Sequence, residues 1–422
     1  MTDATTPNSP IDDISERFLD AYVELVPTAA TYMGIEGYDD RLPDYSPAGF
    51  TALAELNRRT IAEAGTTDTP SEREQVAKEA LLERLGLELE TYQAGIPQYQ
   101  LNAIASVPAE LRQVFDLMPT ETEEHWRTIA TRLGRIGAAL EGYRQSLLEQ
   151  AAQGRVSAVR QVNDLAQRIA SWTGAEGDDF FAGLAARAPD TVKATVEAAA
   201  TEARKAYDQF GAWLETDLAP QAPSRDACGR EVYELASRNF LGAKIDLEET
   251  YAWGWEELAR IEGEMQTIAA ELNSGDRSIQ AVADLLDNDP SRKIHGKEAF
   301  RDWMQRLADA AVTELAGTHF DIPDEIKKIE CMIAPTQEGG IYYTSPNDDF
   351  SRPGRMWWAV PAGLEDFATW REVTTVYHEG APGHHLQVSQ ALLRADTLNR
   401  WQRLLCWCSG HGEGWALYAE RL

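Results

Sequence analysis

Four of the seven histidines in this 422-residue sequence lie close together, from His378 to His411. The first is followed directly by Glu379, at the end of a run with helical spacing. Two imidazoles on one face of a helix can hold zinc, and a glutamate beside the first can take a proton from a metal-activated water. The residue four positions beyond His378 is Pro382, not a second histidine. The pattern predicts His378 as a ligand and Glu379 as the general base, with the second ligand further along the chain.

Helix geometry limits which histidine can be the second ligand. On a regular helix, at ~100° per residue, His384 would lie about 120° away from the face of His378. His385 would share that face but lie roughly 10 Å further along the axis, at ~1.5 Å per residue. Pro382 cannot donate to the carbonyl of His378, and Gly383 relaxes the backbone limits. We therefore expect the helix to be interrupted just before His384, which favours His384 over His385 as the ligand.

A catalytic zinc needs a third protein ligand and keeps one position for water. Glu413 and Glu420 are seven residues apart, so they lie on one face of a predicted helix. We expect Glu413 to complete a site of two histidines and one glutamate, and Glu420 to orient one of the histidines. His385, Glu420 and His411 are the alternative or supporting ligands. The sequence therefore predicts one zinc per chain.

The elements around these residues are predicted to be mainly helical. Apolar residues in Thr120–Gln150 recur at steps of three and four, which a strand cannot produce. A second stripe of this kind runs from Tyr251 to Leu272, and we interpret both stripes as the core of a helical bundle. Capping boxes, in which a side chain accepts a hydrogen bond from an unpaired amide, are predicted at Thr120 with Glu123, Ser71 with Glu74, and Asp246 with Glu249.

Short strands are predicted between residues 323 and 363. Three apolar runs separated by turn-forming residues are typical of a small antiparallel sheet: Ile329–Ala334, Gly340–Thr344 and Met356–Val360. The expected fold class is mostly α, a large helical bundle that encloses an active-site cleft, with the small sheet next to the metal-binding helices. Its sub-regions are a helical part at 1–322, a sheet part at 323–363 and the metal-binding helices at 364–422. They form one continuous catalytic unit, since so small a sheet does not stand alone.

Two pairs of residues near the predicted sheet are candidates for substrate contacts. Tyr342 and Tyr343 lie on a strand that could pair with an extended peptide, or could pack as ordinary strand aromatics. Arg352 and Arg355 could hold a substrate carboxylate through their planar guanidinium groups, or could form surface salt bridges.

Composition restricts the binding partners and the cellular compartment that we expect for this protein. Acidic residues outnumber basic ones by 69 to 39, giving a net charge of −30. Such a charge repels phosphate backbones and anionic lipid surfaces, so neither nucleic acid nor a membrane is an expected partner. The N-terminal sequence lacks the pattern of a signal peptide, no apolar run approaches the ~18 residues of a membrane helix, and the four cysteines give no disulfide framework. We expect a cytoplasmic protein, with its oligomeric state open.

The strings HEGAPGHHLQ and EGWALYAE resemble an uncharacterised bacterial family, numbered 885 among the domains of unknown function. IYYTSP and SRPG extend the resemblance over essentially the whole chain. That family is grouped with the gluzincin metallopeptidases, and its fold resembles that of the carboxypeptidase Taq family. The resemblance implies a glutamate ligand followed seven residues later by another glutamate, which matches Glu413 and Glu420. It also implies a natural protein that continues past Leu422, as does the missing helix cap there.

The function expected from these observations is zinc-dependent hydrolysis, most simply of a peptide bond, by a carboxypeptidase-like enzyme or an oligopeptidase. An amidase that acts on a small non-peptide amide would use the same residues. A non-catalytic helical binding protein with a structural metal is the alternative from another class. A closed shell of four protein ligands would favour that alternative, whereas an open coordination position favours the enzyme.

Overall fold

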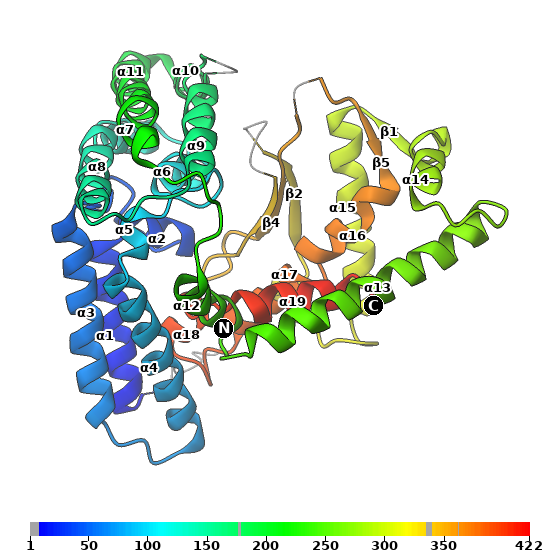
Figure 1. The fold of residues 1–422 in the computed structure, drawn as a ribbon, viewed down its shortest axis with the longest axis horizontal. Helices are drawn as coiled ribbons and strands as arrows, with labels where there is room; N and C mark the ends of the chain where they lie inside the picture. Colours follow the sequence, from blue (N-terminus) through cyan, green and yellow to red (C-terminus); the bar gives the residue numbers. More distant parts are fainter. Residues whose placement is uncertain (1–7, 176–178, 335–339, 362) are drawn as a thin grey trace. The chain divides into compact units, whose positions relative to one another are not determined.

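The protein is described by a computed structural model that covers residues 8–175, 179–334, 340–361 and 363–422 (Figure 1). It comprises two compact units. The first is formed by residues 1–235 and 394–407, and the second by residues 236–393 and 408–422. The chain therefore leaves the second unit after α17, contributes a short segment to the first, and returns. This division follows packing, whereas the three predicted sub-regions follow changes in sequence pattern.

The first unit is built from helices, which confirms the mostly α fold class. Its α-helices are α1 (Pro10–Leu25), α2 (Pro27–Met33), α3 (Pro47–Thr66), α4 (Glu72–Gln93), α5 (Ile96–Tyr99), α6 (Val107–Leu117), α7 (Glu123–Leu133), α8 (Ile136–Ala152), α9 (Val159–Trp172), α10 (Phe180–Ala186), α11 (Asp190–Trp213) and α18 (Arg400–Leu404). The chain reaches the second unit through α12 (Arg230–Leu241).

The apolar stripe of Thr120–Gln150 lies in the main core of the first unit, as predicted. Its members on α7 and α8 are buried in one cluster with residues of α9, α10 and α11, and both helices pack directly on α11. The stripe spans two helices, because α7 ends at Leu133 and α8 begins at Ile136. The predicted cap is wrong by two residues. Thr122 accepts the capping hydrogen bond, and the Thr120 carbonyl accepts one from the indole of Trp126 (2.9 Å).

The other two predicted helix starts are found. Ser71 and Glu74 form a reciprocal capping box at the start of α4. Asp246 caps α13 by accepting from the amides of Glu248 and Glu249. Each satisfies amides that the first helical turn leaves unpaired, so local sequence is sufficient to place these boundaries.

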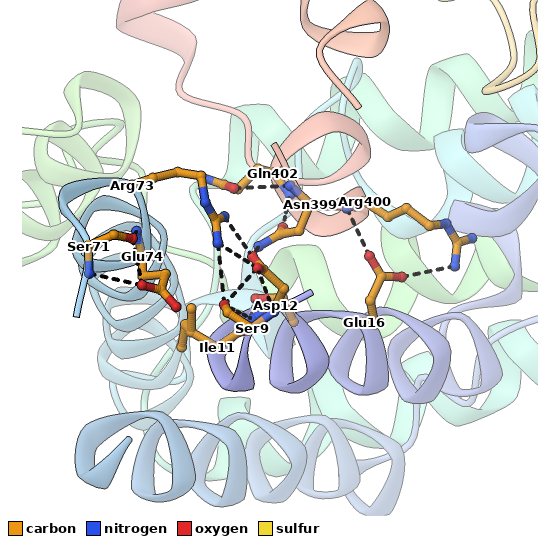
Figure 2. A network of polar contacts seen from close by, with 11 residues as sticks. Ser9, Ile11, Asp12, Glu16, Ser71, Arg73, Glu74, Asn399, Arg400 and Gln402 are labelled. Atoms are coloured by element: carbon orange, nitrogen blue, oxygen red, sulfur yellow. Dashed lines mark hydrogen bonds and ion pairs between the residues drawn. The ribbon is translucent and has the colours of Figure 1, made fainter. Parts of the chain in front are cut away.

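A polar network joins the two chain segments of the first unit (Figure 2). Asp12 on α1 is almost fully buried, and its carboxylate lies 2.7 Å from Nη2 of Arg73 on α4. Asn399, which caps α18, donates to the same carboxylate at 3.1 Å, and the amide of Arg400 donates to Glu16 at 3.0 Å. Trp401 of α18 packs among the apolar residues of α1, α3 and α4. The short segment is thus held by both buried polar bonds and apolar packing.

The second unit combines helices with two small sheets. The helices are α13 (Leu247–Leu272), α14 (Ile279–Asp287), α15 (Lys297–Leu315), α16 (Thr369–Glu379), α17 (His384–Leu393) and α19 (Ser409–Ala419). The strands are β1 (Lys293–His295), β2 (Ile329–Ile333), β3 (Ile341–Thr344), β4 (Gly354–Trp358) and β5 (Asp366–Ala368). No helix in the described part of the chain is long and apolar enough to cross a membrane.

The three predicted strands are β2, β3 and β4, and they form one sheet with the order β2-β4-β3. β3 and β4 pair antiparallel, as expected, but β2 pairs with β4 in parallel, with Ile329 opposite Gly354. The arrangement differs from prediction because β4, not the next strand in sequence, is the neighbour of β2. Turn residues locate strands but do not determine which edges pair. A two-stranded antiparallel sheet of β1 and β5, three residues each, was not predicted.

The stripe from Tyr251 to Leu272 is on α13, but its interpretation as bundle core is wrong. Tyr251 is 67% exposed, Trp255 59% and Leu258 45%, and Ala269 is the one buried residue of this helix. In Figure 1, α13 is the long green helix. The spacing correctly predicts one apolar face, but spacing alone does not say what covers that face.

Candidate metal centre

The predicted interruption of the histidine-bearing helix is present. α16 ends at Glu379 and α17 begins at His384. Between them, the amide of Gly383 donates to the carbonyl of Tyr377 at 3.0 Å. A Cβ atom at position 383 would lie only 1.9 Å from the carbonyl oxygen of His378, so this turn requires glycine. The turn brings the chain back toward the end of α16, and His384 becomes the first residue of the next helix.

Three side chains from three helices converge beyond this turn. Nε2 of His378 lies 3.2 Å from Oε2 of Glu413, and Nε2 of His384 lies 3.5 Å from the same oxygen. The two imidazole rings are nearly perpendicular, at 89°, with their centres 4.8 Å apart. One ligand atom from each of the three residues lies within 4.8 Å of the other two, the one such group among the described residues. The predicted set of His378, His384 and Glu413 is thus brought together.

Glu420 lies outside the three-residue group and contacts His378, as expected for a residue that orients a histidine. Its carboxylate is 2.8 Å from Nδ1 of His378. A carboxylate accepts, so Nδ1 donates to Glu420, and Nε2 is the ring nitrogen that faces Glu413. This is the arrangement in which a neutral imidazole can bind a metal.

Glu379 is buried beside the cluster, with 7% of its surface exposed. Burial raises its pKa to about 7; the charge of Glu413 acts in the same direction and that of His378 opposes it. Burial also lowers the pKa of His384, against the opposing effect of Glu413. A neutral His384 has a nitrogen lone pair available near neutral pH, and Glu379 is a carboxyl group that can exchange a proton there.

His385 points away from the cluster. Its Nε2 lies 2.8 Å from the carbonyl oxygen of Ile326, which can only accept, so Nε2 donates. Its Nδ1, 3.0 Å from the hydroxyl of Tyr343, therefore accepts from that group. Burial lowers the pKa of His385 to about 4 and keeps the ring neutral. Gly354 makes room for this pair, because a Cβ there would lie 2.6 Å from Nδ1 of His385.

The other predicted site residues lie outside the three-residue group. Tyr342 stacks on Trp357 with ring centres 6.1 Å apart, on β3, which is an edge strand of its sheet. Arg355 forms an ion pair with Glu330 at 2.9 Å, and the amide of Arg352 donates to Asn347 at 2.8 Å. His411 lies 3.3 Å from the side-chain amide of Gln387. The contacts of Tyr342, Arg355 and Arg352 belong to the sheet and its adjoining loop, and that of His411 joins α19 to α17.

Sequence reasoning overlooked two residues that shape the site. The indole N–H of Trp415 donates to the carbonyl of Pro382 at 2.7 Å and so ties α19 to the turn. Gly354 leaves the space that the His385 ring and the Tyr343 hydroxyl occupy. Trp415 lies inside the EGWALYAE string, so its position between Glu413 and Glu420 could have identified it as part of the site.

The donor set fits zinc. Two imidazole nitrogens and one carboxylate oxygen are ligands that zinc takes in catalytic sites, with a fourth position left for water or substrate. The Glu420 bond to His378 supplies the outer support that metal-binding histidines usually have. The residues present are therefore compatible with one zinc ion.

Comparison with known proteins places the chain in a family. The family described as "Bacterial protein of unknown function (DUF885)" matches residues 27–422. A solved "putative lipoprotein" from Colwellia psychrerythraea is 20% identical, with a TM-score of 0.82 over 97% of this chain and 77% of that one. Another, from Shewanella oneidensis and also described as a "putative lipoprotein", is 17% identical, with a TM-score of 0.62 over 98% of this chain and 77% of that one. At these identities the likeness shows a shared fold, and no protein of curated function matches the sequence. With its match over nearly its full length, the chain belongs to the bacterial family of unknown function DUF885.

Proposed function

We propose that this chain is a zinc-dependent hydrolase that cleaves peptide bonds, as a carboxypeptidase-like enzyme or an oligopeptidase of gluzincin type. The observation that supports the proposal is the convergence of His378, His384 and Glu413, with ligand atoms within 4.8 Å of one another. These three residues would hold one zinc per chain. A buried glutamate directly after the first histidine is the second element that such a reaction needs.

The chemistry follows from the roles of these groups. A bound zinc would supply a Lewis acid that polarises the scissile carbonyl and lowers the pKa of a water molecule. Glu379 would accept a proton from the attacking water as the new C–O bond forms, and would deliver it to the leaving nitrogen as the C–N bond breaks. Glu420 would keep the proton of His378 on Nδ1, so that Nε2 remains available.

Two alternatives use the same residues. An amidase acting on a small non-peptide amide would need the same metal and base but a different substrate pocket. A helical binding protein with a structural metal would need a closed shell of four protein ligands. The described residues bring three ligand atoms together here, and this favours an enzyme with an open position over a structural site.

The proposed partners follow from chemistry and charge. The substrate is a peptide or a small amide, and the net charge of −30 disfavours nucleic acid and membrane surfaces. The proposed location is the cytoplasm. Because two solved relatives are each described as a "putative lipoprotein", fractionation of cells that make this protein is the test of its location.

The test combines metal analysis with turnover of a mixed peptide library. We expect about one zinc per chain in the parent and severe loss of zinc in His378→Ala, since two remaining ligands cannot enforce the geometry. Glu379→Gln keeps the size of the side chain and removes the basic carboxylate. We expect this variant to keep its zinc and to lose hydrolysis by at least ~100-fold.

Each outcome has a distinct meaning. Full zinc occupancy in His378→Ala would contradict the metal site. Parent-like turnover in Glu379→Gln would exclude Glu379 as the base, and loss of zinc in that variant would make it a ligand instead. A parent that binds zinc but hydrolyses neither peptides nor small amides would favour the binding-protein alternative.

A further inference from the structure

We propose that Trp415 is a positioning residue of the metal centre, whose indole N–H holds the two halves of the site in register before a metal binds. One half is α16, the turn and α17, which carry His378 and His384. The other half is α19, which carries Glu413. This inference rests on the proposed zinc centre and concerns how that centre is built.

The bond itself joins the two halves close to the ligands. Nε1 of Trp415 donates to the carbonyl oxygen of Pro382 at 2.7 Å. Pro382 is two residues before His384, and Trp415 is two residues after Glu413. A single hydrogen bond therefore lies within two residues of a ligand on each side, where a small shift of either backbone changes the distance between ligand atoms.

The ligand atoms themselves do not fix one spacing between the halves. Nε2 of His378 lies 3.2 Å from Oε2 of Glu413, and Nε2 of His384 lies 3.5 Å from the same oxygen. A zinc ion would take its place between these atoms, so their direct contacts would be replaced by bonds to the metal. Holding the halves at one spacing with and without zinc therefore requires a bond that does not use the ligand atoms.

The Trp415 bond meets that requirement. Both partners are neutral, so the bond does not depend on pH or on the metal. The ring has its own packing, with centres 6.1 Å from Phe320 and 5.9 Å from Tyr418. Ala416 and Ala419 on the same helix are buried. Apolar packing therefore holds α19 against its neighbours, and the indole N–H fixes the position of α19 relative to the turn. The bond between Glu420 and His378 is a second link between the two halves, but it involves a titratable pair.

The test removes the N–H while keeping an aromatic ring. We expect Trp415→Phe to fold and to bind zinc at least ~10-fold more weakly than the parent, the low end for loss of a group that supports metal ligands. Zinc affinity is measured by competition with a chelator, and unfolding by urea is measured on metal-free protein. Trp126→Phe is the matched control, because Trp126 also donates from its indole to a backbone carbonyl at 2.9 Å, in the other unit. It should leave zinc affinity unchanged.

A purely structural role predicts a different result. In that case Trp415→Phe would lower the urea midpoint, as we expect of Trp126→Phe, while the folded protein kept the parent's zinc affinity; this outcome would overturn the inference. If Trp415→Phe does not fold, benzothienylalanine at position 415 keeps the bicyclic shape and replaces the N–H by sulfur, and the same loss of affinity is expected. A parent that binds no zinc would refute the proposed function, and the inference with it.

Discussion

His384 and His385 are neighbours in the chain, and their rings face different surroundings. His384 lies 3.5 Å from Glu413 in the three-residue group, whereas both nitrogens of His385 are used by Ile326 and Tyr343. A residue's type does not determine its role here; the direction of its side chain does. At the residue scale, therefore, the same substitution should affect metal binding at position 384 and folding stability at position 385.

We predict that His384→Leu loses zinc and that His385→Leu loses stability. In His385→Leu, the Tyr343 hydroxyl and the Ile326 carbonyl lose their partner in a buried place, which should lower the free energy of unfolding by at least about 2 kcal/mol. Its zinc content should stay near that of the parent. His384→Leu should change the metal-free stability by less than about 1 kcal/mol. Metal analysis and urea unfolding in the presence of a chelator measure both quantities, and zinc loss in His385→Leu alone would reverse the assignment.

At the scale of elements, the turn between α16 and α17 leads to a testable prediction. In Gly383→Ala the new Cβ would lie 1.9 Å from the carbonyl oxygen of His378, so the backbone must move. Because His384 follows directly, we expect both weaker zinc binding and a free energy of unfolding lower by about 2 kcal/mol or more.

The matched control is Gly263→Ala, inside α13. A Cβ there meets nothing within 4 Å, and alanine is the better helix former by about 1 kcal/mol. This variant should be as stable as the parent or slightly more stable. Equal behaviour of the two variants, measured by urea unfolding and chelator competition, would show that the turn tolerates a side chain.

We expect the free energy of unfolding of the first unit to depend on pH, because a buried carboxylate lies at the junction of α1, α4 and α18. Burial opposes ionisation of Asp12, but bonds from Arg73, Ser9 and Asn399 outweigh it and lower its pKa below the model-compound value of 3.8. A lowered pKa means that ionised Asp12 stabilises the fold above about pH 4 and that this contribution is lost as pH falls through the folded-state pKa.

We therefore predict that Asp12→Asn lowers the free energy of unfolding by about 1–3 kcal/mol at pH 7, since it weakens a buried, charge-assisted bond to Arg73. The difference from the parent should shrink below about pH 4. Asp13→Asn is the control: Asp13 is exposed on the same helix turn, and its replacement should change stability by less than about 0.5 kcal/mol. Urea unfolding from pH 3 to 7 makes the comparison, and a gap independent of pH would exclude the ionised carboxylate as the cause.

Local features of the sequence account for most of what could be predicted about the elements. Ser71 and Asp246 mark helix starts through bonds to amides two or three residues away, and Pro382 interrupts a helix through its own missing amide. The grouping of His378 with His384 follows from that interruption. The parallel pairing of β2 with β4 depends on contacts distant in sequence, and the short strands β1 and β5 are too brief to show a pattern.

At the scale of the whole molecule, the two apolar stripes show the limit of periodicity. The stripe on α7 and α8 is buried in the core, and that on α13 is exposed, although both have the same spacing. A pattern of threes and fours says which side chains share a face. It does not show which other element packs against that face.

This difference can be measured with one substitution at two places. Leu140 is 2% exposed on α8, and we expect Leu140→Ala to lower the free energy of unfolding by about 2–5 kcal/mol. Leu258 is 45% exposed on α13, and Leu258→Ala should cost less than about 1 kcal/mol. Urea unfolding gives both values. A cost at Leu258 equal to that at Leu140 would show that something covers the α13 stripe.

The return of the chain to the first unit has a consequence for synthesis. Asn399 bonds to Asp12 across 387 residues of sequence, and Trp401 packs with Ile11 and Ile14. A ribosome adding ~5–20 residues per second needs roughly 20–80 s to make that intervening chain. Throughout this time α1 lacks the segment that adds Trp401 to its apolar cluster and Asn399 to the bonds of its Asp12 carboxylate. Helix α1 therefore leaves the ribosome well before the segment that completes its packing, and its partly covered apolar face is exposed to aggregation during that interval.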